Sequence, residues 1–192
     1  TSLAAGQYEN IAHLIEAQNL QNLAFGTSNA KNITVSFYVK SNKTGTYAFN
    51  ISQSDNSSKQ ATLNYTINSA NTWERKSLTF TGDTSGVIND DTGRGLHLIW
   101  FLAAGSTYNS GSTSATFKTY DNANYAAGQA VNVLDSTDNT WFLTGCQLEV
   151  GQNATTVEHE PFDATFKKCT RYLQILQETD YALTVSYTPL RA

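Results

Sequence analysis

The stretch that decides the fold is residues 33–40, which reads Ile-Thr-Val-Ser-Phe-Tyr-Val-Lys. Apolar and polar side chains alternate along it, and a period of two is typical of a β-strand with one buried face and one exposed face. The turn-forming residues 42–45, Asn-Lys-Thr-Gly, come next, and residues 47–52 alternate again. Two alternating runs joined by a short turn predict a β-hairpin.

The alternation continues toward the C-terminus, at residues 63–67 and 73–80. Residues 96–104 are apolar on both faces apart from His97, which predicts a central strand buried on both sides. Residues 141–150 return to a strand pattern. Short strands separated by turn residues predict antiparallel sheets.

Strands with one exposed face must bury the other, so we expect two antiparallel sheets to enclose an apolar core. The predicted core residues are Val35, Phe37, Phe49, Leu63, Leu78, Leu98, Trp100 and Leu148. Trp73 and Trp141 also lie within strand patterns and are assigned mostly to the core. The predicted fold class is therefore all-β.

The two ends of the chain differ from the middle. Near the N-terminus, Ile11, Leu14 and Ile15 have helical spacing, whereas Ile11, His13 and Ile15 alternate like a strand, so periodicity leaves both open. Near the C-terminus a three-then-four spacing of apolar residues predicts a helix over residues 164–177, and residues 181–187 alternate like a strand. We predict a sandwich domain at residues 1–163 and a helix–strand extension at residues 164–192.

The extension is the candidate assembly segment. Its helical seam consists of Phe166, Cys169, Leu173 and Leu176. The seam is too short to hold chains together by coiled-coil packing alone, so the strand at residues 181–187 is expected to pair with a neighbouring subunit or a following domain. The alternative is that the helix caps an open end of its own sandwich.

The longest segment without a strand pattern is residues 105–138, and loops of this length usually carry a function or form a special corner. Aromatic rings that stack on sugar C–H groups stand there beside amides and a carboxylate suited to sugar hydroxyls. The candidate glycan-binding residues are Tyr108, Phe117, Tyr120, Asp121, Asn122, Asn124 and Tyr125. The alternative is that these rings fold back as a lid over the sheet.

Composition narrows the class of partner. The chain has 192 residues, a formal net charge of -4 and only 15% charged residues, with Lys and Arg scattered. Without a basic stripe to neutralise phosphates, nucleic acid is not an expected partner. No apolar run approaches the roughly 20 residues that cross a bilayer, so no membrane partner is expected either.

Catalytic and metal-binding patterns are not evident in the sequence. His13, His97 and His159 are far apart, and the aspartates lie in turns, where Asp is expected for its hydrogen bonds to local backbone. Residues 89–91, Asn-Asp-Asp, leave a calcium site open as an alternative, although the positions of a known calcium loop are missing. We therefore expect no catalytic residue, metal or cofactor. Cys146 and Cys169 are predicted to be buried free thiols.

Several runs together resemble a family of bacteriophage tail-fibre or virion-fibre structural proteins that carry a domain like a carbohydrate-binding module. The likeness extends from about Tyr8 to Tyr172. The runs that carry it are residues 33–41 (ITVSFYVKS), 80–86 (FTGDTSG), 102–108 (LAAGSTY), 144–151 (TGCQLEVG), 158–159 (EH) and 169–172 (CTRY).

The resemblance implies a jelly-roll β-sandwich, with residues 12–16 as first strand and residues 19–25 as a short helical turn. Two positions depart from the family pattern, since Cys146 stands where Val is more common and Glu160 where Arg is common. The structural calcium of related modules in cellular enzymes is not carried over, because Gly145 and Cys146 occupy the place of its acidic pair.

The function expected from the resemblance is non-enzymatic. It is a virion structural protein, a fibre or a capsid or tail decoration domain, made in the host cytoplasm and displayed on the particle. Its expected partners are further copies in a homotrimer, other virion proteins and a host surface glycan. The alternative is a carbohydrate-binding module, or a fragment of a glycan-degrading tailspike enzyme. Because the chain begins with Thr1 and contains no Met, we expect it to be a piece of a longer polypeptide.

Overall fold

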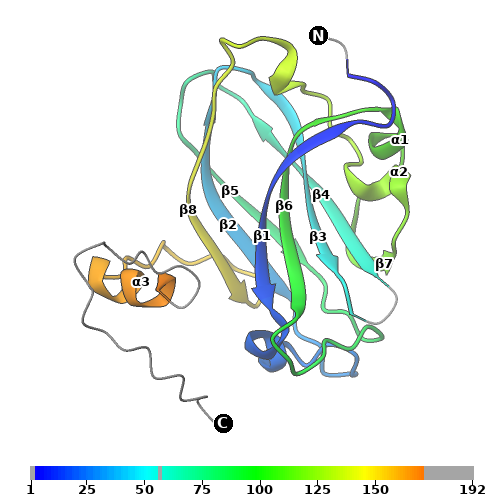
Figure 1. The fold of residues 1–192 in the computed structure, drawn as a ribbon, viewed down its shortest axis with the longest axis vertical. Helices are drawn as coiled ribbons and strands as arrows, with labels where there is room; N and C mark the ends of the chain where they lie inside the picture. Colours follow the sequence, from blue (N-terminus) through cyan, green and yellow to red (C-terminus); the bar gives the residue numbers. More distant parts are fainter. Residues whose placement is uncertain (1–2, 56–57, 171–192) are drawn as a thin grey trace, which may run out of the picture. The chain divides into compact units, whose positions relative to one another are not determined.

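The structure is a computed structural model that describes residues 3–55 and 58–170 (Figure 1). It confirms a mostly β fold, with 43% of the described residues in strands and 16% in helices. The chain divides into two compact units, residues 1–157 and residues 158–192. The division falls at residue 158, whereas the sequence pattern placed it at residue 164.

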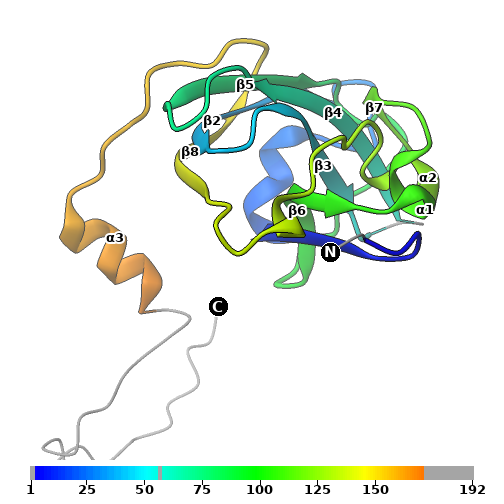
Figure 2. The ribbon, with the colours of Figure 1, turned by 90° about the horizontal axis from the view of Figure 1, so that it is seen from above.

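The first unit contains two antiparallel sheets that face each other as a sandwich (Figures 1 and 2). The five-stranded sheet has the order β1-β6-β3-β4-β7, and the three-stranded sheet has the order β5-β2-β8. The strands are β1 (Tyr8–Glu16), β2 (Ile33–Ser41), β3 (Gly45–Gln53), β4 (Lys59–Ile67), β5 (Glu74–Phe80), β6 (Arg94–Ala104), β7 (Ser114–Thr119) and β8 (Trp141–Val150).

Short helices connect these strands. The 3-10 helix η1 (Ala17–Leu23) follows β1, which decides the N-terminal ambiguity in favour of a strand and then a helical turn. The helices α1 (Ser106–Asn109) and α2 (Asn122–Tyr125) flank β7, and the 3-10 helix η2 (Val133–Asp135) precedes β8.

The predicted hairpin between β2 and β3 is wrong. β2 pairs with β5 and β8, whereas β3 pairs with β4 and β6, so the turn at residues 42–44 carries the chain from one sheet to the other. The two strands meet face to face, with the rings of Phe37 and Phe49 stacked 6.0 Å apart. Periodicity shows which face of a strand is buried, but it does not show which strand is hydrogen-bonded beside it. It therefore could not distinguish a hairpin within one sheet from a connection between the two sheets.

The core lies between the two sheets and has an aromatic centre. The ring of Phe37 lies 5.1 Å from that of Tyr65 and 5.7 Å from that of Trp100, both nearly perpendicular to it. All eight predicted core residues belong to this cluster, with Leu63 and Leu148 only partly buried. Trp141 packs against the cluster, but Trp73 is 45% exposed, so its assignment to the core is wrong.

A second, smaller core covers the outer face of the five-stranded sheet. Ile99 and Phe101 of β6 are buried there with Ala48 and Ala126, and Tyr108 and Tyr125 pack against them. The two helical parts of the segment at residues 105–128, α1 and α2 with Ala126, therefore lie over the outer face of the sheet, which confirms the lid alternative for these two tyrosines. It also confirms that β6 is buried on both faces. The segment is not a plain loop, because it contains α1, β7 and α2.

In the second unit, the structure describes the helix α3 (Phe162–Cys169), which begins two residues before the predicted helix. Phe162 and Phe166 stack 5.9 Å apart on its surface, 82% and 57% exposed respectively. Lys168 forms an ion pair with Glu160. The rest of the predicted helix, including Leu173 and Leu176, and the strand at residues 181–187 lie outside the described residues.

Candidate functional site

Four tyrosines from distant parts of the chain form a cluster on the outer face of the five-stranded sheet. Tyr8 comes from the start of β1 and Tyr108 from α1. Tyr120 lies two residues before α2, and Tyr125 is the last residue of α2. The ring centroid of Tyr8 lies 4.7 Å from that of Tyr108 and 5.5 Å from that of Tyr125, and Tyr120 lies 5.5 Å from Tyr125. Each pair meets edge to face, the arrangement that aromatic quadrupoles favour.

Hydrogen bonds of the predicted polar residues Asp121 and Asn124 hold the part of the chain around α2 in place. The Asp121 carboxylate caps α2, because its Oδ1 accepts a hydrogen bond from the Ala123 amide at 3.0 Å. The Asn124 side chain donates to Asp121 Oδ2 at 3.1 Å and accepts from the Ser112 amide at 2.7 Å. Asp121 and Asn124 therefore shape the segment that presents the tyrosines. Asn122 is exposed on α2.

A hollow of about 180 Å³ lies beside the cluster, and we call it the tyrosine hollow. Its lining residues are Tyr8, Ser52, Gln53, Ser54, Ser58, Lys59, His97, Tyr120 and Tyr125. Tyr8 and Tyr120 are each 40% exposed, so they offer ring surface to a ligand. Ser52, Ser54, Ser58 and His97 line the same hollow.

Burial favours the neutral forms of three side chains in the tyrosine hollow, those of Tyr120, Tyr125 and His97. Burial raises the pKa of Tyr125 to about 12, and burial also raises the pKa of Tyr120. Burial, followed by the charge of Arg94, lowers the pKa of His97, whose Nε2 lies 3.2 Å from Ser54 Oγ. The Lys59 ammonium is paired with the buried Asp83 carboxylate at 3.0 Å. The hollow thus offers neutral donors and acceptors beside aromatic surface.

The structure brings three of the seven predicted glycan-binding residues together in the cluster, namely Tyr108, Tyr120 and Tyr125. The prediction that Phe117 binds glycan is wrong, because this residue is only 6% exposed and its ring packs 5.4 Å from that of Phe25 in the core. It comes from β7, a strand missed in the sequence because only one of its six residues is buried. Tyr8 was missed as well, since only the pairing of β1 with β6 brings it to this place.

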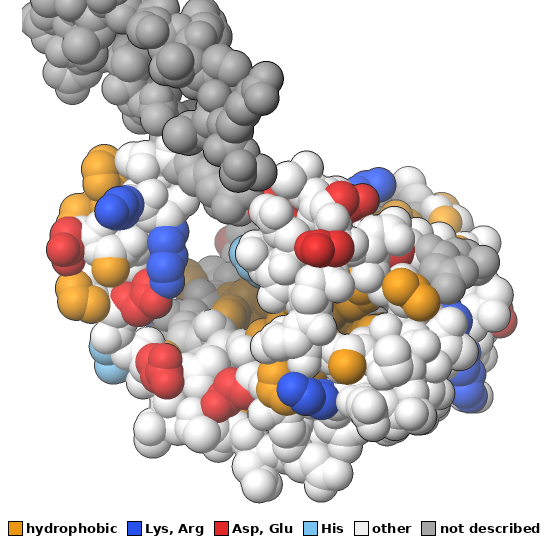
Figure 3. Space-filling view, turned by 90° about the horizontal axis from the view of Figure 1, so that it is seen from below, with side chains coloured by type: hydrophobic (Ala, Val, Ile, Leu, Met, Phe, Trp, Pro, Cys, Tyr) orange, Lys and Arg blue, Asp and Glu red, His pale blue; other side chains and the backbone are white. Residues whose placement is uncertain are grey.

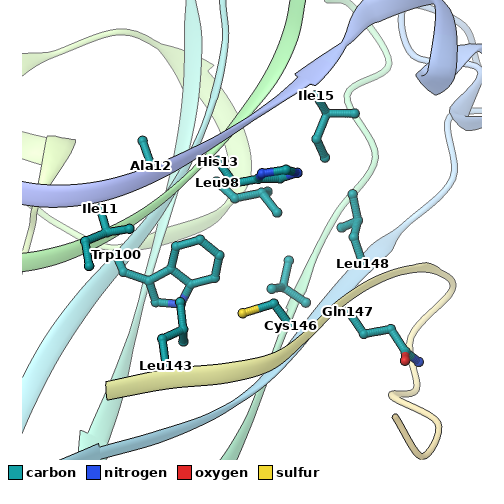
Figure 4. A pocket seen from close by; sticks show the side chains of 11 residues that line it. Ile11, Ala12, His13, Ile15, Leu98, Trp100, Leu143, Cys146, Gln147 and Leu148 are labelled. Atoms are coloured by element: carbon teal, nitrogen blue, oxygen red, sulfur yellow. The ribbon is translucent and has the colours of Figure 1, made fainter. Parts of the chain in front are cut away.

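A second hollow opens between the sheets, and we call it the apolar groove (Figures 3 and 4). Its volume is about 440 Å³. β1 and β8 form its two sides, and its lining residues are Ile11, Ala12, His13, Ile15, Val35, Leu98, Trp100, Leu143, Cys146, Gln147 and Leu148. The walls are almost entirely apolar, so this groove does not suit a sugar, whose hydroxyls need polar partners.

A β-bulge in β8 shapes one wall of the apolar groove. Leu143 and Leu148 are five residues apart, so strict alternation would place them on opposite faces, yet both line the groove. Where β8 pairs with β2, Ser36 lies opposite Gln147 and Tyr38 opposite Thr144, so β8 has one extra residue around Gly145. The φ angle of Gly145 is +56°. A glycine with positive φ at a bulge is favoured because it has no Cβ. The bulge turns both leucines inward.

Both cysteines are free and exposed, which corrects the expectation that they are buried. The thiol of Cys146 points into the apolar groove (Figure 4), where partial burial raises its pKa to about 11. Cys169 and Phe166, two of the predicted assembly residues, are exposed on α3.

Over residues 3–55 and 58–170, no group of three or more His, Cys, Asp and Glu side chains is placed to hold a metal ion. No helix in the described part of the chain is long and apolar enough to cross a membrane.

The first unit is thus an all-β sandwich of two antiparallel sheets, with an aromatic hollow on one sheet and an apolar groove between the sheets. Comparisons with protein families, with curated proteins and with solved structures found no match to this chain.

Proposed function

We propose that this chain is a non-enzymatic structural protein of a bacteriophage particle, a fibre or decoration domain that binds host surface glycans through the tyrosine hollow. The resemblance of its sequence runs to virion-fibre proteins supports the first part of the proposal. The tyrosine hollow supports the second, because it sets the exposed rings of Tyr8 and Tyr120 beside hydroxyl and imidazole groups.

The chemistry of the tyrosine hollow suits one neutral sugar unit. Its 180 Å³ is close to the roughly 150 Å³ of a cavity that holds one benzene molecule, so it accommodates a single pyranose ring. C–H groups of the sugar stack on Tyr8 and Tyr120, while its hydroxyls meet Ser54 and His97. The cation at the hollow, Lys59, is already paired with Asp83, so a charged sugar gains little.

The finer fold and the assembly belong to the same proposal. The sandwich is a jelly roll of the carbohydrate-binding-module type, and its glycan site lies on the outer face of the larger sheet. Copies associate as a homotrimer with other virion proteins at the particle surface. Threefold display compensates a modest affinity per site, because the second and third contacts form at a high effective concentration.

A glycan array with the full chain tests this proposal, with Tyr8→Ala and Tyr120→Ala as variants. The matched control is Tyr38→Ala, since Tyr38 is 37% exposed on the three-stranded sheet. If stacking of a sugar on one ring is worth as much as stacking of a nucleobase, about 1–3 kcal/mol, each hollow variant should lose about 5- to 150-fold in affinity. Equal binding by all four proteins, or no binding to any host glycan, contradicts the proposal. Release of reducing sugar by the chain alone contradicts its non-enzymatic part.

A further inference from the structure

The two sides of the apolar groove are sheet edges. β1 pairs with β6 and β8 pairs with β2, and among the described residues neither has a partner strand on its other side. Exposed edges are templates for an added strand, and proteins usually protect them with charged side chains. Here residues 10–15 of β1 and residues 141–148 of β8 contain no Asp, Glu, Lys or Arg. Both edges are therefore unprotected along the groove.

Within the described residues of the first unit, no further layer covers the walls of the groove. Ile11 is 45% exposed, and Leu143 and Leu148 are only partly buried. The indole of Trp100 is 2% exposed, yet its Nε1 has no hydrogen-bond partner among the described residues. A buried donor without a partner is costly, and an added strand supplies both apolar side chains and backbone carbonyls.

The sequence itself contains a segment with the matching chemistry. Residues 181–187 read Tyr-Ala-Leu-Thr-Val-Ser-Tyr, and none of the seven is charged. In an extended strand with this sequence, Leu183 and Val185 would share one face with the two tyrosines. As a strand, seven residues span about 23 Å, slightly more than the groove-lining stretch 143–148 of β8. The groove volume of about 440 Å³ equals about three benzene-sized cavities, enough for Leu183, Val185 and one tyrosine ring.

We infer that the apolar groove between β1 and β8 receives residues 181–187 of a second copy of this chain as an added strand. This inference rests on the assembly part of the proposed function and gives that assembly a place and a mechanism. The strand completes the sandwich of one copy, links it to the next, and exposes no charge to the apolar interior.

Disulfide trapping tests the inference, because the Cys146 thiol already points into the groove. One protein carries Cys169→Ser and keeps Cys146 as its single thiol. The other carries Cys146→Ser, Cys169→Ser and either Leu183→Cys or Val185→Cys. The two are mixed at micromolar concentration, oxidised with copper phenanthroline and separated on a non-reducing gel. The matched control is Thr184→Cys, which lies on the opposite face of the same segment.

The expected result is a mixed dimer with Leu183→Cys or Val185→Cys, at least tenfold more abundant than with Thr184→Cys. Equal trapping on both faces, or no mixed dimer at all, overturns the inference. A third protein carries Cys146 and Val185→Cys in one chain. If it forms an internal disulfide as a monomer and not a link between copies, the inference is overturned, since the occupant is then not a second copy.

Reactivity of Cys146 provides a second measurement without a new thiol. In the Cys169→Ser background, Leu183→Asp should raise the rate of Cys146 labelling by maleimide at least tenfold, whereas Thr184→Asp should not. Equal rates contradict the inference. Because Tyr8→Ala leaves the groove unchanged, it should reduce glycan binding and preserve the mixed dimer, so failure of one proposal is distinguishable from failure of the other.

Discussion

Replacement of a buried and an exposed tryptophan provides the sharpest test of the fold. Trp100 is 2% exposed, and its ring lies 4.9 Å from that of Phe49 and 5.7 Å from that of Phe37. Removal of a large buried aromatic side chain costs about 3–5 kcal/mol, so Trp100→Ala should lower the free energy of unfolding by that amount. Trp73 is 45% exposed and makes a cation–π contact with Lys40, so Trp73→Ala should cost only about 0.5–1 kcal/mol.

Urea denaturation followed by circular dichroism measures the two values. With a urea m-value of about 2 kcal/mol per molar, Trp100→Ala should lower the midpoint by about 1.5–2.5 M, and Trp73→Ala by about 0.5 M or less. Trp100→Phe is an informative third variant. It keeps a ring in the core and removes the unpartnered Nε1, so its cost should be smaller than that of Trp100→Ala. Equal midpoints for Trp100→Ala and Trp73→Ala would refute this assignment of the core.

Three further predictions concern the lid, the bulge and acid stability. Tyr125→Ala should lower the unfolding free energy by about 2–4 kcal/mol, because the ring packs 5.0 Å from Phe101 in the second core, and a midpoint unchanged from wild type would show that the lid does not stabilise the sheet. Gly145→Ala should cost about 1–2 kcal/mol, since its φ of +56° disfavours any residue with a Cβ, and thermal unfolding against Gly6→Ala as control measures this. Desolvation alone would raise the pKa of Glu74, but hydrogen bonds from Lys76, Ser69 and Asn68 outweigh it and lower that pKa to about 2. The carboxylate therefore contributes stability above pH 4.5 that is lost as pH falls toward 2, and Glu74→Gln should flatten this part of the stability profile; a profile as steep as that of wild type contradicts the assignment.

Alternation along single strands was enough to predict the layers of this fold. Alternation identified the core face of β2 at Val35 and Phe37. The uninterrupted apolar run at residues 98–104 identified β6 as a strand buried on both faces. Alternation did not identify the hydrogen-bonded partners of each strand. A strand shows the same alternation whether the next strand in the sequence pairs with it in one sheet or packs against it from the other sheet. For that reason the turn after Ser41 was assigned to a hairpin, although it crosses between the sheets.

The candidate site was predictable only in its local part. Tyr108, Tyr120 and Tyr125 belong to one connection and were found by composition, whereas Tyr8 is far away in sequence and meets them only through the β1–β6 register. Phe117 shows the opposite error, since composition does not separate an aromatic ring on the lid from one on a short strand that enters the core. Trp73 stands just before β5, outside the alternation that buries Leu78 and Phe80.

β1 contributes to both hollows, but through different residues. Tyr8 at its start belongs to the tyrosine hollow, whereas Ile11, His13 and Ile15 line the apolar groove. The first site offers rings and neutral polar groups, which suits a sugar, and the second offers apolar walls and free sheet edges, which suits a polypeptide strand. Because the two sites share no lining residue, substitutions in them should act independently, within about 0.3–0.5 kcal/mol of additivity. The proposed glycan recognition and the proposed assembly then use separate parts of one sandwich, so a substitution in one site should leave the other intact.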